Sequence, residues 1–198
     1  MKEQTVFFDL GNVLLFFSHE RMWAQLSDLT KIAPEILRQQ FIEKGAFEAY
    51  ETGRLATEHI FRTLKTLSNR SFSLLEAMRA ASDIFTPNTE LWPLVEELKS
   101  RGTRLVLLSN TNESHFNFAY SHYPILKLFD AYILSFQVKA CKPQPEIFRR
   151  ALQEAQGKAF YTDDVPAFIE AARSSGLDAE LFTDVPSLKQ HLKARQFL

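Results

Sequence analysis

The chain has 198 residues, of which 45% are hydrophobic and 24% charged, a composition that supports a folded core and excludes disordered and collagen-like chains. Its 23 Lys and Arg residues nearly balance 24 Asp and Glu residues, and a net charge of −1 argues against nucleic acid as a partner. A single cysteine, Cys141, cannot form an internal disulfide, which favours a reducing, cytoplasmic environment. No apolar run suits a membrane span or a signal peptide, so we expect no membrane partner.

Short apolar runs separated by helical patterns predict a parallel sheet. These runs cover residues 5–10, 104–109, 131–135, 159–163 and 179–183. Helical patterns at 89–101, 144–156 and 165–175 are each followed by a glycine, which is a common C-terminal stop for a helix. Strands that alternate with such helices are typical of a doubly wound α/β fold.

The interval between the first and second runs is much longer than a single crossover requires. Within residues 18–85 the apolar spacing is helical rather than alternating. We therefore expect an α/β core formed by residues 1–17 and 86–198, with a helical cap inserted at 18–85. Aromatic cap residues such as Trp23 and Tyr50 are candidates for substrate contact, but core packing is their expected role.

Polar residues follow these runs at the sheet edge where parallel sheets bind ligands. The residues are Asp9 after the first run, Ser109 and Asn110 at the second, Lys142 after the third, and Asp163 and Asp164 at the fourth. Three carboxylates, a hydroxyl and an ammonium group can bind a divalent cation and a phosphoryl group, and can attack phosphorus. Each segment alone is also an ordinary turn or helix-cap sequence.

Together, the segments FDLGNV at 8–13, LSNT at 108–111, Lys142-Pro143 and Asp163-Asp164 resemble the four motifs of the haloacid dehalogenase (HAD) superfamily in order and spacing. The resemblance spans nearly the whole chain. Within the superfamily the chain looks most like the branch with a small helical cap, which contains bacterial glucose-1-phosphate phosphatases and the phosphatase domain of soluble epoxide hydrolase. The resemblance implies a Rossmann-like core and a Mg²⁺-dependent phosphatase that hydrolyses a small phosphorylated metabolite, such as a sugar 1-phosphate, through an aspartyl-phosphate intermediate.

The resemblance also implies roles for residues that bind or attack the phosphoryl group. Asp9 is the expected nucleophile. Ser109 is expected to donate a hydrogen bond to a phosphoryl oxygen, helped by backbone amides near Asn12 and Asn110. Lys142 is expected to neutralise charge between Asp9 and the phosphoryl group.

A metal site is implied by the same motifs. Mg²⁺ is expected to bind Asp9, the backbone carbonyl of Gly11 and the Asp163-Asp164 pair, of which one carboxylate would suffice. Phe168 occupies a place where the family often has asparagine, and this difference would weaken the support of the metal site.

Gly11 departs from the family pattern, since phosphatases of the superfamily carry an aspartate there as general acid and base. Loss of such a group costs about 10²–10⁴-fold in rate. Gly11 therefore favours substrates whose leaving group departs easily, or a substitute histidine such as His19 or His115.

Two further functions are compatible with the sequence. Haloacid dehalogenases also lack the second aspartate and displace halide from carbon, but they need no metal, and the adjacent Asp163 and Asp164 argue against this function. A degenerate protein that binds a phosphorylated metabolite without turnover would explain Gly11. The presence of Asp9, Ser109 and Lys142 argues against that alternative.

Overall fold

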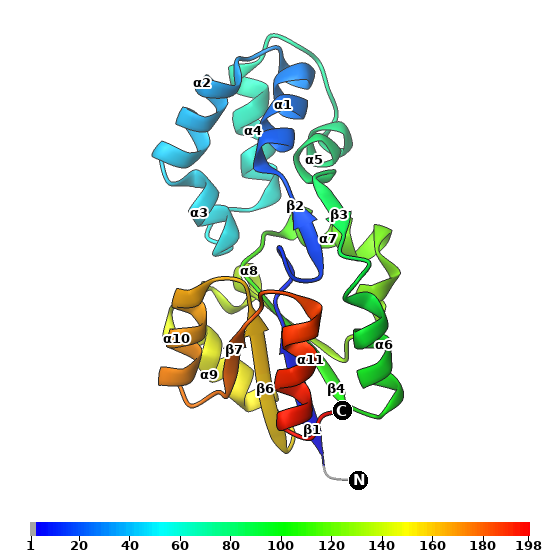
Figure 1. The fold of residues 1–198 in the computed structure, drawn as a ribbon. Coiled ribbons are helices and arrows are strands. Elements are labelled where there is room, and N and C mark those ends of the chain that lie inside the picture. Colours follow the sequence, from blue (N-terminus) through cyan, green and yellow to red (C-terminus); the bar gives the residue numbers. More distant parts are fainter. Residues whose placement is uncertain (1–2) are drawn as a thin grey trace.

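The computed structural model describes residues 3–198 and shows an α/β core below a helical cap, with two short strands between them (Figure 1). The core sheet has the order β5-β4-β1-β6-β7, and all of its neighbouring strands are parallel. Its strands are β1 (Gln4–Phe8), β4 (Arg104–Ser109), β5 (Ala131–Leu134), β6 (Lys158–Asp163) and β7 (Ala179–Leu181). The predicted parallel α/β fold is confirmed.

Helices cover both faces of this sheet. They are α6 (Trp92–Ser100), α7 (Glu113–His122), the 3₁₀ turn η2 (Pro124–Leu128), α8 (Ser135–Val138), α9 (Pro145–Glu154), α10 (Pro166–Ser174) and α11 (Val185–Ala194). In the central strand β1, Val6, Phe7 and Phe8 are fully buried, because packed side chains cover both sheet faces. Val6 and Phe8 join one hydrophobic cluster and Phe7 joins another.

The cap consists of α1 (His19–Thr30), α2 (Pro34–Arg38), the π-helical turn η1 (Gln39–Glu43), α3 (Ala46–Glu51), α4 (Thr57–Leu67) and α5 (Leu74–Ser82). Strands β2 (Leu15–Phe17) and β3 (Phe85–Pro87) pair antiparallel where the chain enters and leaves it. The division into core 1–17 and 86–198 and cap 18–85 stays our interpretation, and residues 1 and 2 lie outside the described part.

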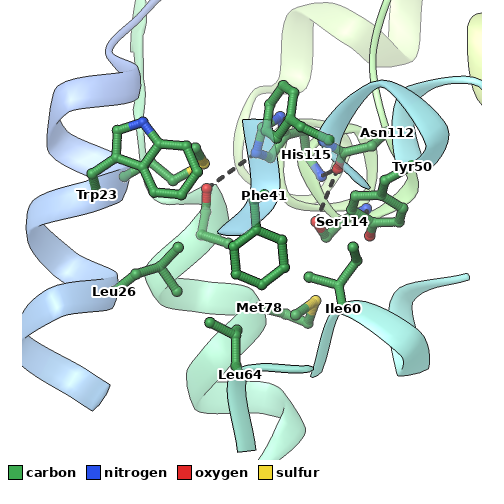
Figure 2. A pocket seen from close by; sticks show the side chains of 13 residues that line it. Trp23, Leu26, Phe41, Tyr50, Ile60, Leu64, Met78, Asn112, Ser114 and His115 are labelled. Carbon is green, nitrogen blue, oxygen red and sulfur yellow. Dashed lines mark hydrogen bonds between the residues drawn. The ribbon is translucent and has the colours of Figure 1, made fainter. Parts of the chain in front are cut away.

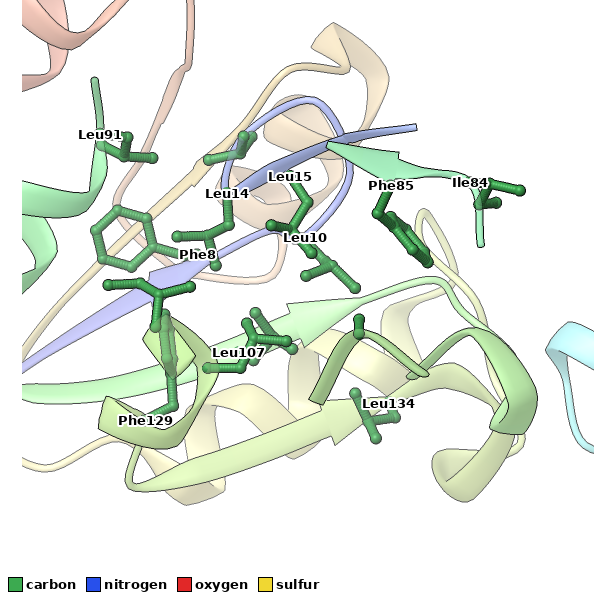
Figure 3. Close-up of a cluster of buried hydrophobic side chains, with 14 of the residues drawn as sticks. Phe8, Leu10, Leu14, Leu15, Ile84, Phe85, Leu91, Leu107, Phe129 and Leu134 are labelled. Atoms are coloured by element: carbon green, nitrogen blue, oxygen red, sulfur yellow. The ribbon is translucent and has the colours of Figure 1, made fainter. Parts of the chain in front are cut away.

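One hydrophobic cluster continues from the sheet into the cap. Figure 3 shows Phe8 and Leu107 of the sheet near Leu15 and Phe85 of the connecting strands. The same cluster includes Trp23 and other buried cap residues. Because this packing is continuous, it fixes the cap relative to the carboxyl edge of the sheet. Within residues 3–198, no helix is both long enough and apolar enough to cross a membrane.

Candidate active site

Three carboxylates converge where β1 and β6 end. Asp9 follows β1, while Asp163 ends β6, the strand that pairs with β1. Asp9, Asp163 and Asp164 each offer an oxygen atom, and these atoms all lie within 4.8 Å of one another. Such a group of carboxylate oxygens suits a hard divalent cation.

Lys142 lies inside this carboxylate group and is only 3% exposed. Its Nζ atom lies 2.7 Å from Asp9 Oδ1 and 2.5 Å from Asp163 Oδ2. It also lies 3.2 Å from the Leu108 carbonyl oxygen and 3.2 Å from the Tyr161 hydroxyl oxygen. The structure therefore brings together Asp9, Lys142, Asp163 and Asp164, as the sequence predicts.

The buried charges in this site do not cancel. Burial raises the pKa of Asp9 to about 7, and the charge of Asp163 acts in the same direction, while Lys142 opposes both. For Lys142, burial acts to lower the pKa, but Asp9 and Asp163 outweigh it and raise the pKa. One ammonium group offsets only one of the two carboxylates that contact it, so the site favours an additional proton or cation.

Asn110 holds the loop that carries Lys142. The Lys142 backbone N–H donates to Asn110 Oδ1 at 2.7 Å, and Asn110 Nδ2 donates to the Lys142 carbonyl at 2.9 Å. Both polar atoms of the Asn110 side chain are therefore engaged with the Lys142 backbone. The predicted contact of Asn110 with a phosphoryl group concerns its backbone amide. Ser109 is 2% exposed, and its hydroxyl makes one long contact of 3.4 Å with the Asn110 carbonyl. That hydroxyl can therefore turn to another acceptor.

Asn12 is held by hydrogen bonds of both its backbone and its side chain. Its N–H donates to the Leu15 carbonyl at 2.8 Å, so this amide already has an acceptor within the turn. The Asn12 side chain donates instead to Asp164 Oδ2 at 3.1 Å and orients that carboxylate. Asn12 has a φ of 54°, a left-handed conformation that asparagine tolerates better than most residues.

Phe17 occupies the space beside Gly11. A Cβ atom on Gly11 would lie 2.7 Å from Phe17 Cε1, so any side chain at position 11 must displace that ring. Phe168, the second departure from the family pattern, lies with its ring centroid 5.1 Å from Lys142 Nζ. An aromatic face at this distance attracts the ammonium group.

Tyr161 is a site residue that sequence analysis missed. Its fully buried hydroxyl contacts Lys142 Nζ and donates a short hydrogen bond to Asp163 Oδ2. Burial raises the pKa of Tyr161 well above its usual range, so the hydroxyl keeps its proton. The sequence did contain a signal for Tyr161. Residues two apart on a strand share a face, so Tyr161 lies on the same face of β6 as Asp163.

Neither candidate histidine lies among the carboxylates. Figure 2 shows His115 in the wall of a cavity between the cap helices and α7, beside Asn112 and Ser114. His115 is 5% exposed, and its Nε2 atom lies 3.1 Å from the Ala81 carbonyl oxygen. Burial lowers the pKa of His115 to about 4. His19 packs its ring 5.0 Å from that of Phe17, and burial lowers its pKa.

The aromatic cap residues and the cysteine have packing roles. Trp23 and Tyr50 are 4% and 5% exposed and line the same cavity, as predicted for core residues. Phe47 is half-buried and contacts Trp23. Burial raises the pKa of the Cys141 thiol, which therefore lacks the thiolate character of a reactive cysteine.

Comparison with known proteins identifies the family of this chain. The model of the haloacid dehalogenase-like hydrolases matches residues 3–176. A curated relative, the D-ribitol-5-phosphate phosphatase of Bacteroides thetaiotaomicron, is 23% identical over 185 residues, which cover 88% of this chain and 89% of the relative.

Solved structures share the fold of this chain. A HAD family enzyme from Bacteroides thetaiotaomicron, in complex with magnesium and inorganic phosphate, superposes with a TM-score of 0.81 at 22% identity, over 94% of this chain and 98% of that one. A HAD-like hydrolase structure from Porphyromonas gingivalis gives a TM-score of 0.78 at 22% identity, over 97% and 98% of the two chains. The nearer resemblance to glucose-1-phosphate phosphatases and epoxide hydrolase stays a prediction. Since the family model covers most of the chain, the chain belongs to the haloacid dehalogenase-like hydrolase family.

Proposed function

We propose that the protein is a Mg²⁺-dependent phosphatase that hydrolyses a small phosphorylated metabolite, such as a sugar or sugar-alcohol phosphate, through an aspartyl-phosphate intermediate. The observation that carries this proposal is the group formed by Asp9, Asp163 and Asp164 around buried Lys142. Two relatives support it, since one acts on D-ribitol 5-phosphate and another binds magnesium and inorganic phosphate.

The donor set fits a magnesium ion. Asp163 already uses both oxygens, because Oδ1 accepts from the Val165 N–H at 2.9 Å and Oδ2 accepts from Lys142 and Tyr161. Asp9, Asp164 and the Gly11 carbonyl would therefore hold the ion, while Asp163 would hold Lys142 in place. When bound, Mg²⁺ supplies positive charge that offsets the phosphoryl oxygens.

The residues of this chain supply the covalent chemistry. Asp9 would attack phosphorus in line with the leaving oxygen, forming a new oxygen–phosphorus bond as the bond to the leaving group breaks. Ser109, Lys142 and the amides of Leu10 and Gly11 would stabilise the phosphoryl oxygens during this step. Water would then hydrolyse the aspartyl-phosphate and release inorganic phosphate.

Asp9→Asn tests this function, with release of p-nitrophenol from p-nitrophenyl phosphate measured in Mg²⁺ and in EDTA. The variant keeps the side-chain shape but loses the nucleophilic charge, so kcat should fall at least about 10³-fold, or about 4 kcal/mol of transition-state stabilisation. Asp28→Asn is the matched control, since that carboxylate is 89% exposed on α1.

Three outcomes would contradict parts of the proposal. Turnover that EDTA does not reduce would exclude the metal requirement. An Asp9→Asn variant with more than a tenth of wild-type turnover would exclude covalent attack by Asp9 and favour attack by water. Metal-independent halide release from 2-haloacids would instead establish the dehalogenase alternative.

A further inference from the structure

Tyr161 holds a hydroxyl group at a fixed place below the candidate active site. It belongs to β6, which lies between β1 and β7 in the core sheet, and its side chain is fully buried. Its ring packs edge-on against that of Phe148 on α9, with the ring centroids 6.2 Å apart. Phe7, its register partner on β1, belongs to the same hydrophobic cluster. Because a tyrosine ring has only two side-chain torsions, this packing also fixes the hydroxyl oxygen.

The packing of this ring does not require a hydroxyl group. A phenylalanine at position 161 would occupy nearly the same volume and keep the contact with Phe148. Moving a hydroxyl group out of water costs free energy unless it forms hydrogen bonds in the protein. The hydroxyl of Tyr161 meets this condition through two charged side chains of the site, Lys142 and Asp163. Its interactions therefore belong to the site and not to the hydrophobic cluster.

The hydroxyl closes a triangle of contacts with these two side chains. It donates to Asp163 Oδ2, and its oxygen lies 3.2 Å from Lys142 Nζ. The same Nζ atom lies 2.5 Å from Asp163 Oδ2. A hydroxyl group can donate one hydrogen bond and accept another, so Tyr161 can serve the carboxylate and the ammonium group at once.

Asp163 is held at both of its oxygens by the core. Oδ1 accepts from the Val165 N–H at 2.9 Å, while Oδ2 accepts from Tyr161 and Lys142. The carboxylate cannot rotate without losing one of these donors. Asp163 and Tyr161 thus form a rigid socket for the ammonium group.

Lys142 needs such a socket, because its long side chain is flexible and its ammonium group has three N–H donors. The acceptors around Nζ are Asp9 Oδ1 at 2.7 Å, Asp163 Oδ2 at 2.5 Å, and the Leu108 carbonyl and Tyr161 hydroxyl oxygens at 3.2 Å. The two carboxylates are the shorter and stronger acceptors. A phosphoryl oxygen that binds Lys142 would therefore replace a neutral acceptor, and the hydroxyl of Tyr161 would still donate to Asp163.

We propose that Tyr161 is a positioning residue for phosphoryl transfer, whose hydroxyl holds Asp163 so that Lys142 stays beside Asp9 and the phosphoryl oxygens. This inference rests on the proposed phosphatase function. Tyr161 itself forms and breaks no covalent bond in the reaction. Its effect should be largest in the transition state, because an ammonium group displaced by about 1 Å can lose about 10²-fold in rate.

Tyr161→Phe tests this role, because it removes the hydroxyl and keeps the ring. With p-nitrophenyl phosphate in saturating Mg²⁺, kcat should fall about 10-fold or more, while KM changes by less than about threefold. The Mg²⁺ concentration for half-maximal activity should also change by less than about threefold, since the hydroxyl bonds Lys142 and Asp163 rather than the proposed ligand Asp164. Circular dichroism checks that the variant is folded.

Binding of two anions separates positioning from a structural role and needs no turnover. Vanadate can adopt the five-coordinate geometry of the transition state, whereas inorganic phosphate resembles the product. In calorimetric titrations with Mg²⁺ present, Tyr161→Phe should weaken vanadate binding about 10-fold and phosphate binding less than about threefold. Damage to the packing of the site would weaken the two anions equally.

Tyr132→Phe is the matched control. Tyr132 is also on a strand of the core sheet, β5, and its hydroxyl donates to the Leu126 carbonyl at 2.7 Å. Its loss should leave kcat, KM and both anion affinities unchanged.

Several results would overturn the inference. They are full kcat in Tyr161→Phe, equal weakening of vanadate and phosphate, a raised Mg²⁺ requirement, or an equal loss of kcat in Tyr132→Phe. Each of these results leaves the phosphatase function standing, provided that the wild type is active. If the wild type does not hydrolyse p-nitrophenyl phosphate, the proposed phosphatase function itself fails.

Discussion

Replacing Lys142 with methionine tests whether the buried ammonium group holds the site together. Lys142 is 3% exposed, Asp163 is fully buried and Asp9 is 7% exposed, so water screens these charges poorly. Removing one partner of a buried ion pair costs about 3–5 kcal/mol, because the other charge is left uncompensated. Methionine fills much of the space of the lysine stem, so a cavity adds little to this cost.

We therefore expect Lys142→Met to lower the free energy of unfolding by about 3–5 kcal/mol. The measurement is urea unfolding followed by circular dichroism, in EDTA and at constant pH. Lys189→Met is the control, since Lys189 is exposed on α11 and its replacement should change the free energy by less than about 0.5 kcal/mol.

A double variant separates charge from packing. Lys142→Met combined with Asp163→Asn also removes the more deeply buried of the two carboxylate charges that contact Lys142, so stability should recover by at least about half of the loss. A loss below about 1 kcal/mol in Lys142→Met would refute the inference that this ion pair is buried and tightly coupled. A double variant that is no more stable than Lys142→Met would show that the loss arises from packing.

Three further changes address the metal, the turn and acid stability. Asp164→Asn should raise the Mg²⁺ concentration for half-maximal activity by about 10–100-fold, and an unchanged titration would exclude Asp164 as a ligand. Gly11→Asp should lower the free energy of unfolding by about 1–3 kcal/mol, because its Cβ meets Phe17, and adding Phe17→Leu should restore it in melting experiments. His115 has a folded pKa of about 4, below its unfolded value, so its contribution to stability is complete above about pH 6.5 and declines as pH falls. Between pH 8 and pH 5 the wild type should lose about 2 kcal/mol more than His115→Gln, whereas His59→Gln should follow the wild type.

The sheet was predictable because its strands are buried on both faces. The run 104–109 coincides with β4, and 159–163 matches all but the first residue of β6, since continuous apolar stretches leave few alternatives. Helix α7 was not predicted. Its aromatic residues Phe116, Phe118 and Tyr120 occupy every second position, a spacing typical of a strand. The Asn112 side chain nevertheless caps a helix there by accepting the His115 N–H at 3.0 Å.

The site was predictable where its residues follow strands, and not where they meet through packing. Asp9 follows β1 and Asp163 ends the neighbouring strand β6, so topology alone brings them together. Tyr161 lies inside a strand and looks like an ordinary core residue until its hydroxyl is seen beside Lys142. The contact of Phe17 with Gly11 depends on how β2 folds back over the turn, which no local pattern encodes.

The departures from the family pattern have a common physical consequence. Phe17 lies against Gly11, and Phe168 faces Lys142, so aromatic rings stand where polar side chains are usual. Apolar walls exclude water and strengthen the attraction between Lys142 and the developing charge on the phosphoryl oxygens. The same walls cannot supply a proton to the leaving group. The proposed enzyme should therefore favour aryl over alkyl phosphates, because an aryl leaving group needs little protonation.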